Sequence, residues 1–254
     1  MENCENAILD SLRRRRSVRA FTDEPVTAAE KAAILRAAVE APTAGCQQLY
    51  TILDVTDPAL KRRLSETCDH QPFIATAPLV LLFLADVERW YDAYLAAGLT
   101  PRKPGAGDLM LAVCDALIAA QNAVVAAESL GIGSCYIGDV MEQCETHRAL
   151  LGLTDYVFPA ALLVFGRPTP QQAAREKPAR LPMNAVVREN GYRRASEAEL
   201  REMFRGRTAS QNYDEWMRAF CARKYDSDFS REMTRSVTRY LAPFLANGQG
   251  AERT

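Results

Sequence analysis

The sequence predicts an α+β protein in which helices outnumber strands. Two continuous apolar runs, residues 78–84 and 160–165, are typical of strands that are buried on both faces. Between them, residues 108–130 are rich in alanine and apolar on almost every side, which is typical of a buried central helix. Strand and helix patterns interleave along 254 residues without internal repeats, so one α+β domain is the simplest interpretation.

Helix signals are clearest near the N-terminus. Residues 6–14 predict a short helix that ends in an arginine-rich stretch. Thr27 and Glu30 form a capping box that opens a helix to about residue 39, and Pro42 ends it. The apolar face of this helix is predicted to contain Ile34, Leu35, Ala38 and Val39.

The helix at residues 108–130 is long enough to span a bilayer, but its polar residues argue against that. Insertion into a membrane would be costly for four of its side chains: Asp115, Gln121, Asn122 and Glu128. We therefore expect a central helix of a soluble protein, and a place in a subunit interface stays open. Gly131 fits the C-cap of this helix.

Other segments carry weaker signals. Residues 50–55 predict a strand and residues 58–68 a helix. Residues 166–192 contain four prolines and predict a long irregular connection, which is usually functional or wraps a partner. The last sixty residues predict helices, of which residues 229–245 are the most amphipathic, with a break near Pro243.

Composition excludes several classes of protein. Hydrophobic residues make up 48% of the chain, so we expect a packed core. The net charge of −1 and the pI of about 6.2 do not suit a general nucleic-acid binder, and any cationic cluster is a local device. His70 and His147 have no partner at metal-ligand spacing, which argues against a zinc site, and no Gly-x-Ser-x-Gly elbow indicates a hydrolase.

The cysteines predict free thiols. The chain has seven, an odd number, and none forms a Cys-x-x-Cys pair. The N-terminus shows no apolar signal region. We therefore expect a cytoplasmic protein in a reducing compartment.

Three polar clusters lie in loops at the ends of predicted elements. They are residues 15–19, with Arg15, Arg16, Ser17 and Arg19; residues 41–48; and residues 177–182, with Lys177 and Arg180. Guanidinium groups match phosphate oxygens two at a time, so both cationic clusters could serve one anion. The middle cluster offers small residues and amides to the edge of a planar polar ligand. Solvated basic loops and a plain turn are the alternatives for the three clusters.

Five motifs in order make a more specific pattern. They are Arg-Arg-Ser-x-Arg-x-Phe from Arg15, Ala-Pro-Thr-Ala-Gly-x-x-Gln from Ala41, Gly-Ile-Gly-Ser-Cys-Tyr-Ile-Gly from Gly131, Leu-Leu-Val-Phe-Gly-Arg-Pro from Leu162 and Lys-Pro-x-Arg-Leu-Pro from Lys177. From about Ile8 to Pro182, the chain resembles the nitroreductase family. It is most similar to the branch of oxygen-insensitive group A NADPH nitroreductases and flavin reductases.

The resemblance implies an α+β nitroreductase-like fold with a mixed central sheet flanked by helices. It also implies an intertwined homodimer with one FMN at each interface, and no nucleic-acid or membrane partner. We expect residues 1–192 to form the FMN-binding domain and residues 193–254 a C-terminal helical extension that packs on the same domain.

The resemblance also implies roles for single residues. Arg15, Arg16 and Ser17 would hold the FMN phosphate and ribityl oxygens, while Arg19 would lie near the pyrimidine edge of the flavin and tune it. The other positions that match flavin contacts of the family are Thr43 and Gln48, often from the second subunit; Gln71; Ile137, Gly138 and Asp139, near the reactive nitrogen; and Lys177 and Arg180, as a second phosphate clamp.

The chain departs from the family pattern at several positions. Cys46 stands where many members have asparagine, and we expect a small buried side chain there rather than a redox thiol. Asp139 stands where the branch usually has glycine, and the 177–180 spacing has one residue more than usual. Met141 occupies the place of an arginine that holds the extra phosphate of NADPH. Arg205 and Arg207 are candidate substitutes, so a preference for NADPH over NADH stays open.

The implied activity is an FMN-dependent NAD(P)H oxidoreductase that reduces nitroaromatics, quinones or free flavin by a ping-pong hydride mechanism. No side-chain nucleophile is needed, because the cofactor carries the chemistry. One alternative is a specialised flavoenzyme such as an aromatic reductive dehalogenase, whose substrate lid would correspond to residues 90–102. Others are a flavin-binding module without turnover and, less consistent with two cationic loops, a structural helical protein.

Overall fold

The computed structural model describes residues 6–208 and 212–246 and divides into two compact units. The first contains the chain up to Arg175 and returns from Glu232 onward, and the second is Glu176–Arg231. This division differs from the predicted boundary at residue 192, and it groups the start of the last helix, α12 (Asp228–Leu245), with the second unit. As a statement about where an FMN-binding domain ends, the boundary stays a prediction.

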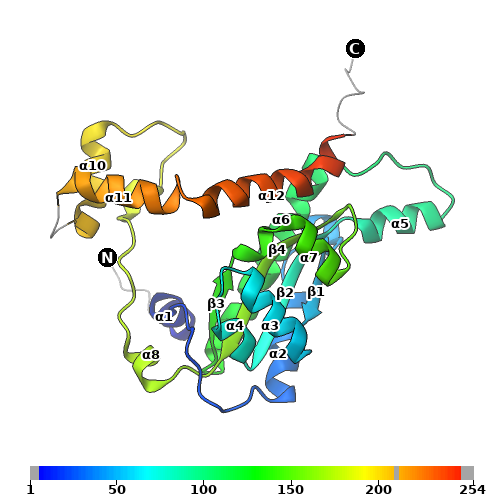
Figure 1. Ribbon diagram of the computed structural model, residues 1–254, viewed down its shortest axis with the longest axis horizontal. Helices are drawn as coiled ribbons and strands as arrows, with labels where there is room; N and C mark the ends of the chain where they lie inside the picture. Colours follow the sequence, from blue (N-terminus) through cyan, green and yellow to red (C-terminus); the bar gives the residue numbers. More distant parts are fainter. Residues whose placement is uncertain (1–5, 209–211, 247–254) are drawn as a thin grey trace. The chain divides into compact units, whose positions relative to one another are not determined.

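The first unit is built on a four-stranded sheet with the order β1-β2-β4-β3 (Figure 1). Its strands are β1 (Tyr50–Asp54), β2 (Leu79–Asp86), β3 (Gly133–Ile137) and β4 (Val157–Gly166). All three ladders are antiparallel, with Ile52 opposite Phe83, and with Leu162 of β4 opposite both Leu82 and Ile137. The predicted mixed sheet is therefore mixed only through one parallel bridge, between Ser17 and Ser134.

Both central strands are buried on two sides, as their continuous apolar runs predict. Alternate residues of β2 enter two separate cores, so Leu81 and Phe83 face one and Leu82 faces the other. The first core contains α2 (Ala28–Val39), α6 (Ala106–Ser129) and the last turns of α12 (Asp228–Leu245). The second contains α3 (Pro58–Thr67), α4 (Phe73–Thr76) and the turn η2 (Asp139–Met141), so an α+β architecture is confirmed.

Helix α6 is the predicted central helix. Its length and composition would allow a membrane span, yet one side packs into the first core through alanines that allow close approach to the sheet. Gly131 follows it at φ +73°, which confirms the predicted C-cap. The opposite side of α6 exposes apolar side chains in this single chain: Met110, Leu111, Leu117 and Ile118.

The capping signals near the N-terminus are confirmed in the structure. In α1 (Ala7–Arg14), Asn6 Oδ1 accepts the amide of Leu9 at 3.0 Å. In α2, Thr27 and Glu30 make the reciprocal capping-box bonds at 2.8 and 3.2 Å. The predicted apolar face of α2 is wrong at Val39, which is about half exposed because it lies in the last turn.

Several short elements were not predicted from the sequence. These are η1 (Ala44–Cys46), α5 (Glu88–Ala96), α7 (Cys144–Leu151), α8 (Pro170–Ala174) and α9 (Met183–Val186), together with α4, β3 and η2. The predicted break at Pro243 is wrong, because α12 continues to Leu245. Pro243 lies in the last turn, where its missing amide costs one intrahelical bond and does not end the helix.

The second unit is a small helical body. It contains α9, α10 (Glu197–Thr208) and α11 (Tyr213–Lys224). Phe204 of α10 lies 6.1 Å from Trp216 of α11 between ring centroids, and Arg201 of α10 donates to Asp214 of α11 at 3.0 Å. These contacts join α10 and α11 within the unit.

Candidate functional site

The segment that carries the arginine motif runs beside β3 as an extra edge strand. Ser17 bridges Ser134 in parallel, and the Val18 amide donates to the Ser134 carbonyl at 2.9 Å. A Cβ at Gly133 would lie only 2.3 Å from Val18 Cγ2, so the close approach requires glycine there. The glycine-rich motif thus provides the surface on which the arginine motif lies.

A second contact fixes the same segment from the other side. The buried side-chain amide of Gln172 in α8 accepts from the Arg19 amide at 3.3 Å and donates to the Ser17 carbonyl at 3.4 Å. The Thr22 amide donates to the Arg167 carbonyl at 2.9 Å. Sequence reasoning missed Gln172, because no spacing signal separates it from any other short-helix glutamine.

Arg15, Ser17 and Arg19 gather near the middle of β3. Burial raises the pKa of the Cys135 thiol, and Arg19, Ser17 and Arg15 all oppose that rise from nearby. Burial also raises the pKa of Tyr136 to about 12, against the opposing charge of Arg15. Two guanidinium groups therefore lie beside this strand.

The charges of these two arginines are not neutralised by acidic side chains. Within residues 6–208 and 212–246, neither Arg15 nor Arg19 forms an ion pair. By contrast, Arg167 pairs with Glu24 and with Glu30, and Arg235 pairs with Glu145 at 3.0 Å. Cations without carboxylate partners favour an anionic ligand at this position.

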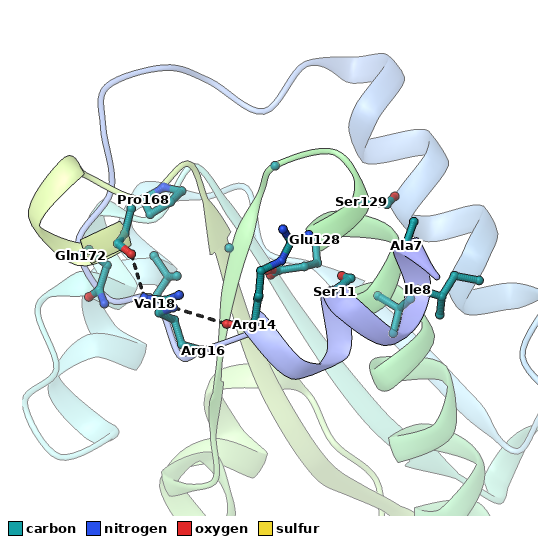
Figure 2. A pocket seen from close by; sticks show the side chains of 14 residues that line it. Ala7, Ile8, Ser11, Arg14, Arg16, Val18, Glu128, Ser129, Pro168 and Gln172 are labelled. Carbon is teal, nitrogen blue, oxygen red and sulfur yellow. Dashed lines mark hydrogen bonds between the residues drawn. The ribbon is translucent and has the colours of Figure 1, made fainter. Parts of the chain in front are cut away.

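Arg16 points elsewhere. Its guanidinium donates to the Ala173 carbonyl at 2.7 Å and also to the Arg175 carbonyl, at the end of α8. Figure 2 shows it at the edge of a cavity of about 530 Å³, with Val18 and Gln172 at one end and α1 at the other. Of the twelve predicted site residues, Arg16 alone lines this cavity, which the others do not enclose.

The motif after β3 forms a compact acidic turn. Ile137 is buried and ends the strand, Gly138 precedes η2, and Asp139 is half-buried at its start. The next carboxyl, Glu142, is 7% exposed, and burial together with Asp139, Asp69 and Glu232 raises its pKa to about 7. Met141 packs against both cores, so its apolar side chain is used internally.

Gln71 lies in a turn close to η2. Its side-chain amide donates to the Cys68 carbonyl at 2.9 Å, which directs it toward the end of α3. Burial raises the pKa of Cys68 to about 12, and the Asp139 carboxylate contributes to that rise. Positive φ angles at Asp69 and His70 make the tight turn that brings Gln71 near the β3 end.

Thr43 and Gln48 belong to a different part of the fold. The Thr43 hydroxyl donates to the buried Asp115 carboxylate, which also accepts from the amides of Ala44 at 2.9 Å and Leu49 at 3.1 Å. The backbone amide of Gln48 in turn donates to Thr43 Oγ1 at 2.8 Å. A carboxylate in an apolar helix was the available signal for this anchor, but the sequence alone did not connect it to the loop.

The prediction that Cys46 is buried is wrong. Gly45 and Cys46 both have φ of +56°, and this left-handed turn exposes the Cys46 side chain. The five other described cysteines are also free thiols, and Cys4 lies outside the described residues.

The remaining predicted residues lie in the second unit. Lys177 is half-buried and Arg180 is exposed. Of the two candidate arginines for NADPH, Arg205 forms an ion pair with Glu202 on α10, and Arg207 is exposed on the same helix. Their roles stay predictions, as do those of the residues in the first unit.

Within the first unit, the predicted residues form two groups. Arg15, Ser17 and Arg19 lie along β3, and Ile137, Gly138 and Asp139 extend from its end, with Gln71 near them. Thr43 and Gln48 precede β1, which is the opposite edge of the sheet. The first group combines uncompensated cations with backbone at a strand end, a set suited to an anionic ligand with a planar part.

Comparisons with known proteins agree with this arrangement. The chain is 34% identical over 237 residues to "FMN reductase [NAD(P)H]" of Bacillus subtilis, covering 92% of this chain and 91% of the relative. It is 35% identical over 212 residues to "Oxygen-insensitive NADPH nitroreductase" of Salmonella typhimurium, covering 79% and 84%. The structure of the NADPH:FMN oxidoreductase from Vibrio harveyi complexed with NAD+ aligns with a TM-score of 0.75 at 25% identity, covering 95% and 99%.

The family profile agrees with the motifs that first suggested the resemblance. It carries the description "Nitroreductase family" and matches residues 12–167, which include the arginine motif, the Thr43 loop and the whole sheet. The predicted resemblance is thereby confirmed, and the chain belongs to the nitroreductase family.

Proposed function

We propose that this protein is an FMN-dependent oxidoreductase that takes hydride from NADPH or NADH and reduces nitroaromatics, quinones or free flavin by a ping-pong mechanism. The observation that carries the proposal is the pair of uncompensated guanidinium groups, Arg15 and Arg19, beside the glycine-rich strand β3. The names of the relatives, FMN reductase and NADPH nitroreductase, agree with the cofactors and with an enzymatic role. Free thiols fit a cytoplasmic location.

The residues beside β3 fit FMN by the chemistry of their donors. The phosphate of FMN is an anion, and Arg15 and the Ser17 hydroxyl can donate to oxygens of such a group, while Arg19 can lie near the pyrimidine edge of the ring. The planar ring requires a close backbone approach, and the Ile137–Gly138–Asp139 turn offers backbone with a glycine at its centre. Arg16 and Gln71 belong to the same proposed cofactor set, and the predicted second phosphate clamp, Lys177 and Arg180, is in the second unit.

FMN held by these residues would supply the hydride-transfer chemistry, and the chain would place and tune it. Arg19 supplies positive charge, which favours the reduced anionic form of a flavin. Asp139 supplies negative charge near the strand end and opposes this effect. Gln172 and Gly133 hold the arginine segment on the sheet.

A homodimer is part of the proposal. Thr43 and Gln48 precede β1, while the arginine segment lies against β3 at the opposite sheet edge, so one chain does not bring both groups together along the sheet. The exposed apolar side chains of α6 offer a surface for a second copy. In a two-fold pair, each copy's Thr43 loop would complete the partner copy's site.

The test is the visible spectrum of purified protein reconstituted with FMN, recorded without oxygen before and after NADPH or NADH. We expect flavin absorbance near 450 nm to bleach on addition of the nucleotide and to recover when a nitroaromatic or quinone is added. Tight FMN binding without bleaching would instead indicate a flavin-binding module. Faster turnover of halotyrosines than of nitroaromatics would indicate a reductive dehalogenase. Protein that binds no FMN, and is colourless once free FMN is removed, would refute all three flavin-dependent functions.

A further inference from the structure

An aromatic cavity of about 280 Å³ lies beside the Thr43 loop, and it is separate from the cavity at Arg16. It is enclosed by α5, by the 97–105 loop, by the first turns of α6 and by Gln47. Its apolar lining combines aromatic rings, prolines and aliphatic side chains: Trp90, Tyr91, Tyr94, Pro101, Pro104, Leu49, Val87 and Leu111. This is the residue range in which the sequence suggested room for a substrate lid.

The wall formed by α5 is fixed to the loop that contains Gln48. Trp90 Nε1 donates to the Gln47 carbonyl at 2.8 Å, and Arg89 donates to the carbonyls of Gln48 at 3.3 Å and Tyr50 at 3.2 Å. These three bonds tie the first turn of α5 to the end of the loop and the first residue of β1. The position of the aromatic wall is therefore set by the same loop that we propose contacts the flavin of the second copy.

The opposite wall is also held in place. Arg102 makes a bidentate contact with Asp108 at 2.6 and 2.9 Å, and the Gly105 amide donates to the same carboxylate at 2.8 Å. The loop with Pro101 and Pro104 is thus pinned to the start of α6. A cavity with two fixed walls binds a ligand with little ordering cost.

The chemistry of the cavity favours electron-poor aromatic rings. The rings of Trp90 and Tyr94 lie 5.8 Å apart at 44°, so they present electron-rich surfaces at an angle. No hydrogen-bond partner for the Tyr94 hydroxyl lies among residues 6–208 and 212–246, so this hydroxyl can donate to a ligand oxygen. A nitro group or a quinone carbonyl is such an acceptor on an electron-deficient ring.

We propose that this cavity binds the aromatic ring of the electron acceptor, with Trp90 and Tyr94 as the stacking surface and the Tyr94 hydroxyl as a donor to a nitro or quinone oxygen. The inference rests on the proposed function and deepens it, because it names the residues by which the chain would recognise the aromatic ring of an acceptor.

The experiment measures binding without turnover, on oxidised FMN-loaded protein in the absence of nicotinamide. The chain has two tryptophans, so a Trp216→Phe background leaves Trp90 as the reporter, and a Trp90→Phe background leaves Trp216. The probes are 4-nitrobenzyl alcohol and, as an electron-rich match of similar size, 4-methoxybenzyl alcohol. We expect saturable quenching of Trp90 by the nitro compound and only linear, collisional quenching of Trp216.

Variants then separate the cavity from the rest of the protein. Tyr94→Leu should weaken the binding of 4-nitrobenzyl alcohol about tenfold, and Tyr94→Phe should weaken it less, because it loses only the hydroxyl. Tyr225→Leu, at an exposed tyrosine of the second unit, should leave it unchanged. Tyr225→Leu should also leave the rate at which NADPH bleaches the flavin unchanged.

Equal affinity in Tyr94→Leu, non-saturable quenching of Trp90, or equal binding of the methoxy compound would each overturn the proposal. These outcomes differ from failure of the proposed function. That failure would appear as flavin that nicotinamide does not bleach, whether or not the nitro compound binds.

Discussion

Arginine side chains near the N-terminus differ in what their charges meet. Arg13 is exposed and lies 3.8 Å from Asp10, whereas Arg19 has no ion-pair partner among the described residues and lies beside Cys135 on β3. The sequence shows a run of like charges in which these side chains look equivalent. Both side chains are exposed, and only the pairing of residues 17–18 with β3 gives Arg19 a position from which it can act on a cofactor.

Arg19→Gln should lower the midpoint potential of bound FMN, and Arg13→Gln should not. One unit charge near an exposed flavin edge is worth about 1 kcal/mol, which is on the order of 20 mV for a two-electron couple. A redox titration of the two FMN-loaded variants measures the difference. Equal potentials in both would show that Arg19 does not tune the flavin.

Glu142 should make the protein less stable above neutral pH. Its pKa is raised to about 7 from 4.5, so between these values the folded state keeps a proton that the unfolded state has lost. The free energy of unfolding therefore falls as pH rises through this window, and then stays level with respect to this group. Glu142→Gln should remove the effect and stabilise the protein by roughly 1–3 kcal/mol at pH 8 but little at pH 4.5.

Urea denaturation at both pH values measures this difference. Glu145→Gln serves as the control, because Arg235 lowers the pKa of that exposed carboxyl and its substitution should not stabilise the protein at pH 8. Equal gains from Glu142→Gln at pH 4.5 and pH 8 would contradict the assignment to this buried carboxyl.

At the scale of elements, local signals predicted the longest helix and the two central strands, whose apolar patterns are strong on their own. β3 was missed because it has only five residues, begins with Gly133 and Ser134, and pairs with β4 and Ser17, which are distant in sequence. The loop at Thr43 was located, yet its anchor, Asp115, lies more than sixty residues away. The motifs gave the candidate site residues, while non-local pairing determined which of them lie together.

Asp115 should control the order of the whole Thr43 loop. Asp115→Ala leaves three donors, at Thr43, Ala44 and Leu49, without their acceptor in a buried place, and should cost about 3 kcal/mol or more. Hydrogen exchange at residues 43–49 should accelerate. Asn122→Ala on the same helix removes one bond to the Ala37 carbonyl and should cost about 1 kcal/mol, with no change in that loop.

For the whole molecule, the division of the proposed site between opposite sheet edges allows a test by subunit exchange. The double variant Arg15→Ala/Arg19→Ala and the double variant Thr43→Ala/Gln48→Ala should each lose flavin reduction in homodimers. When the two double variants are mixed and allowed to exchange subunits, random pairing would make half of the dimers hybrid, and each hybrid would have one intact site. Activity should then return to about a quarter of the unmutated level. No recovery of activity in a mixture whose hybrid dimers are detected by their mass would contradict a shared site.

Gly133 has a further consequence for how such proteins can change. Since a methyl group there would collide with Val18, any larger residue at this position becomes acceptable only together with a smaller one at residue 18. Neither change is neutral alone, because one creates a clash and the other a gap. Across lineages the two positions should therefore be inherited as a pair, so a constraint that looks like turn chemistry in one chain is a coupling between two residues far apart in the sequence.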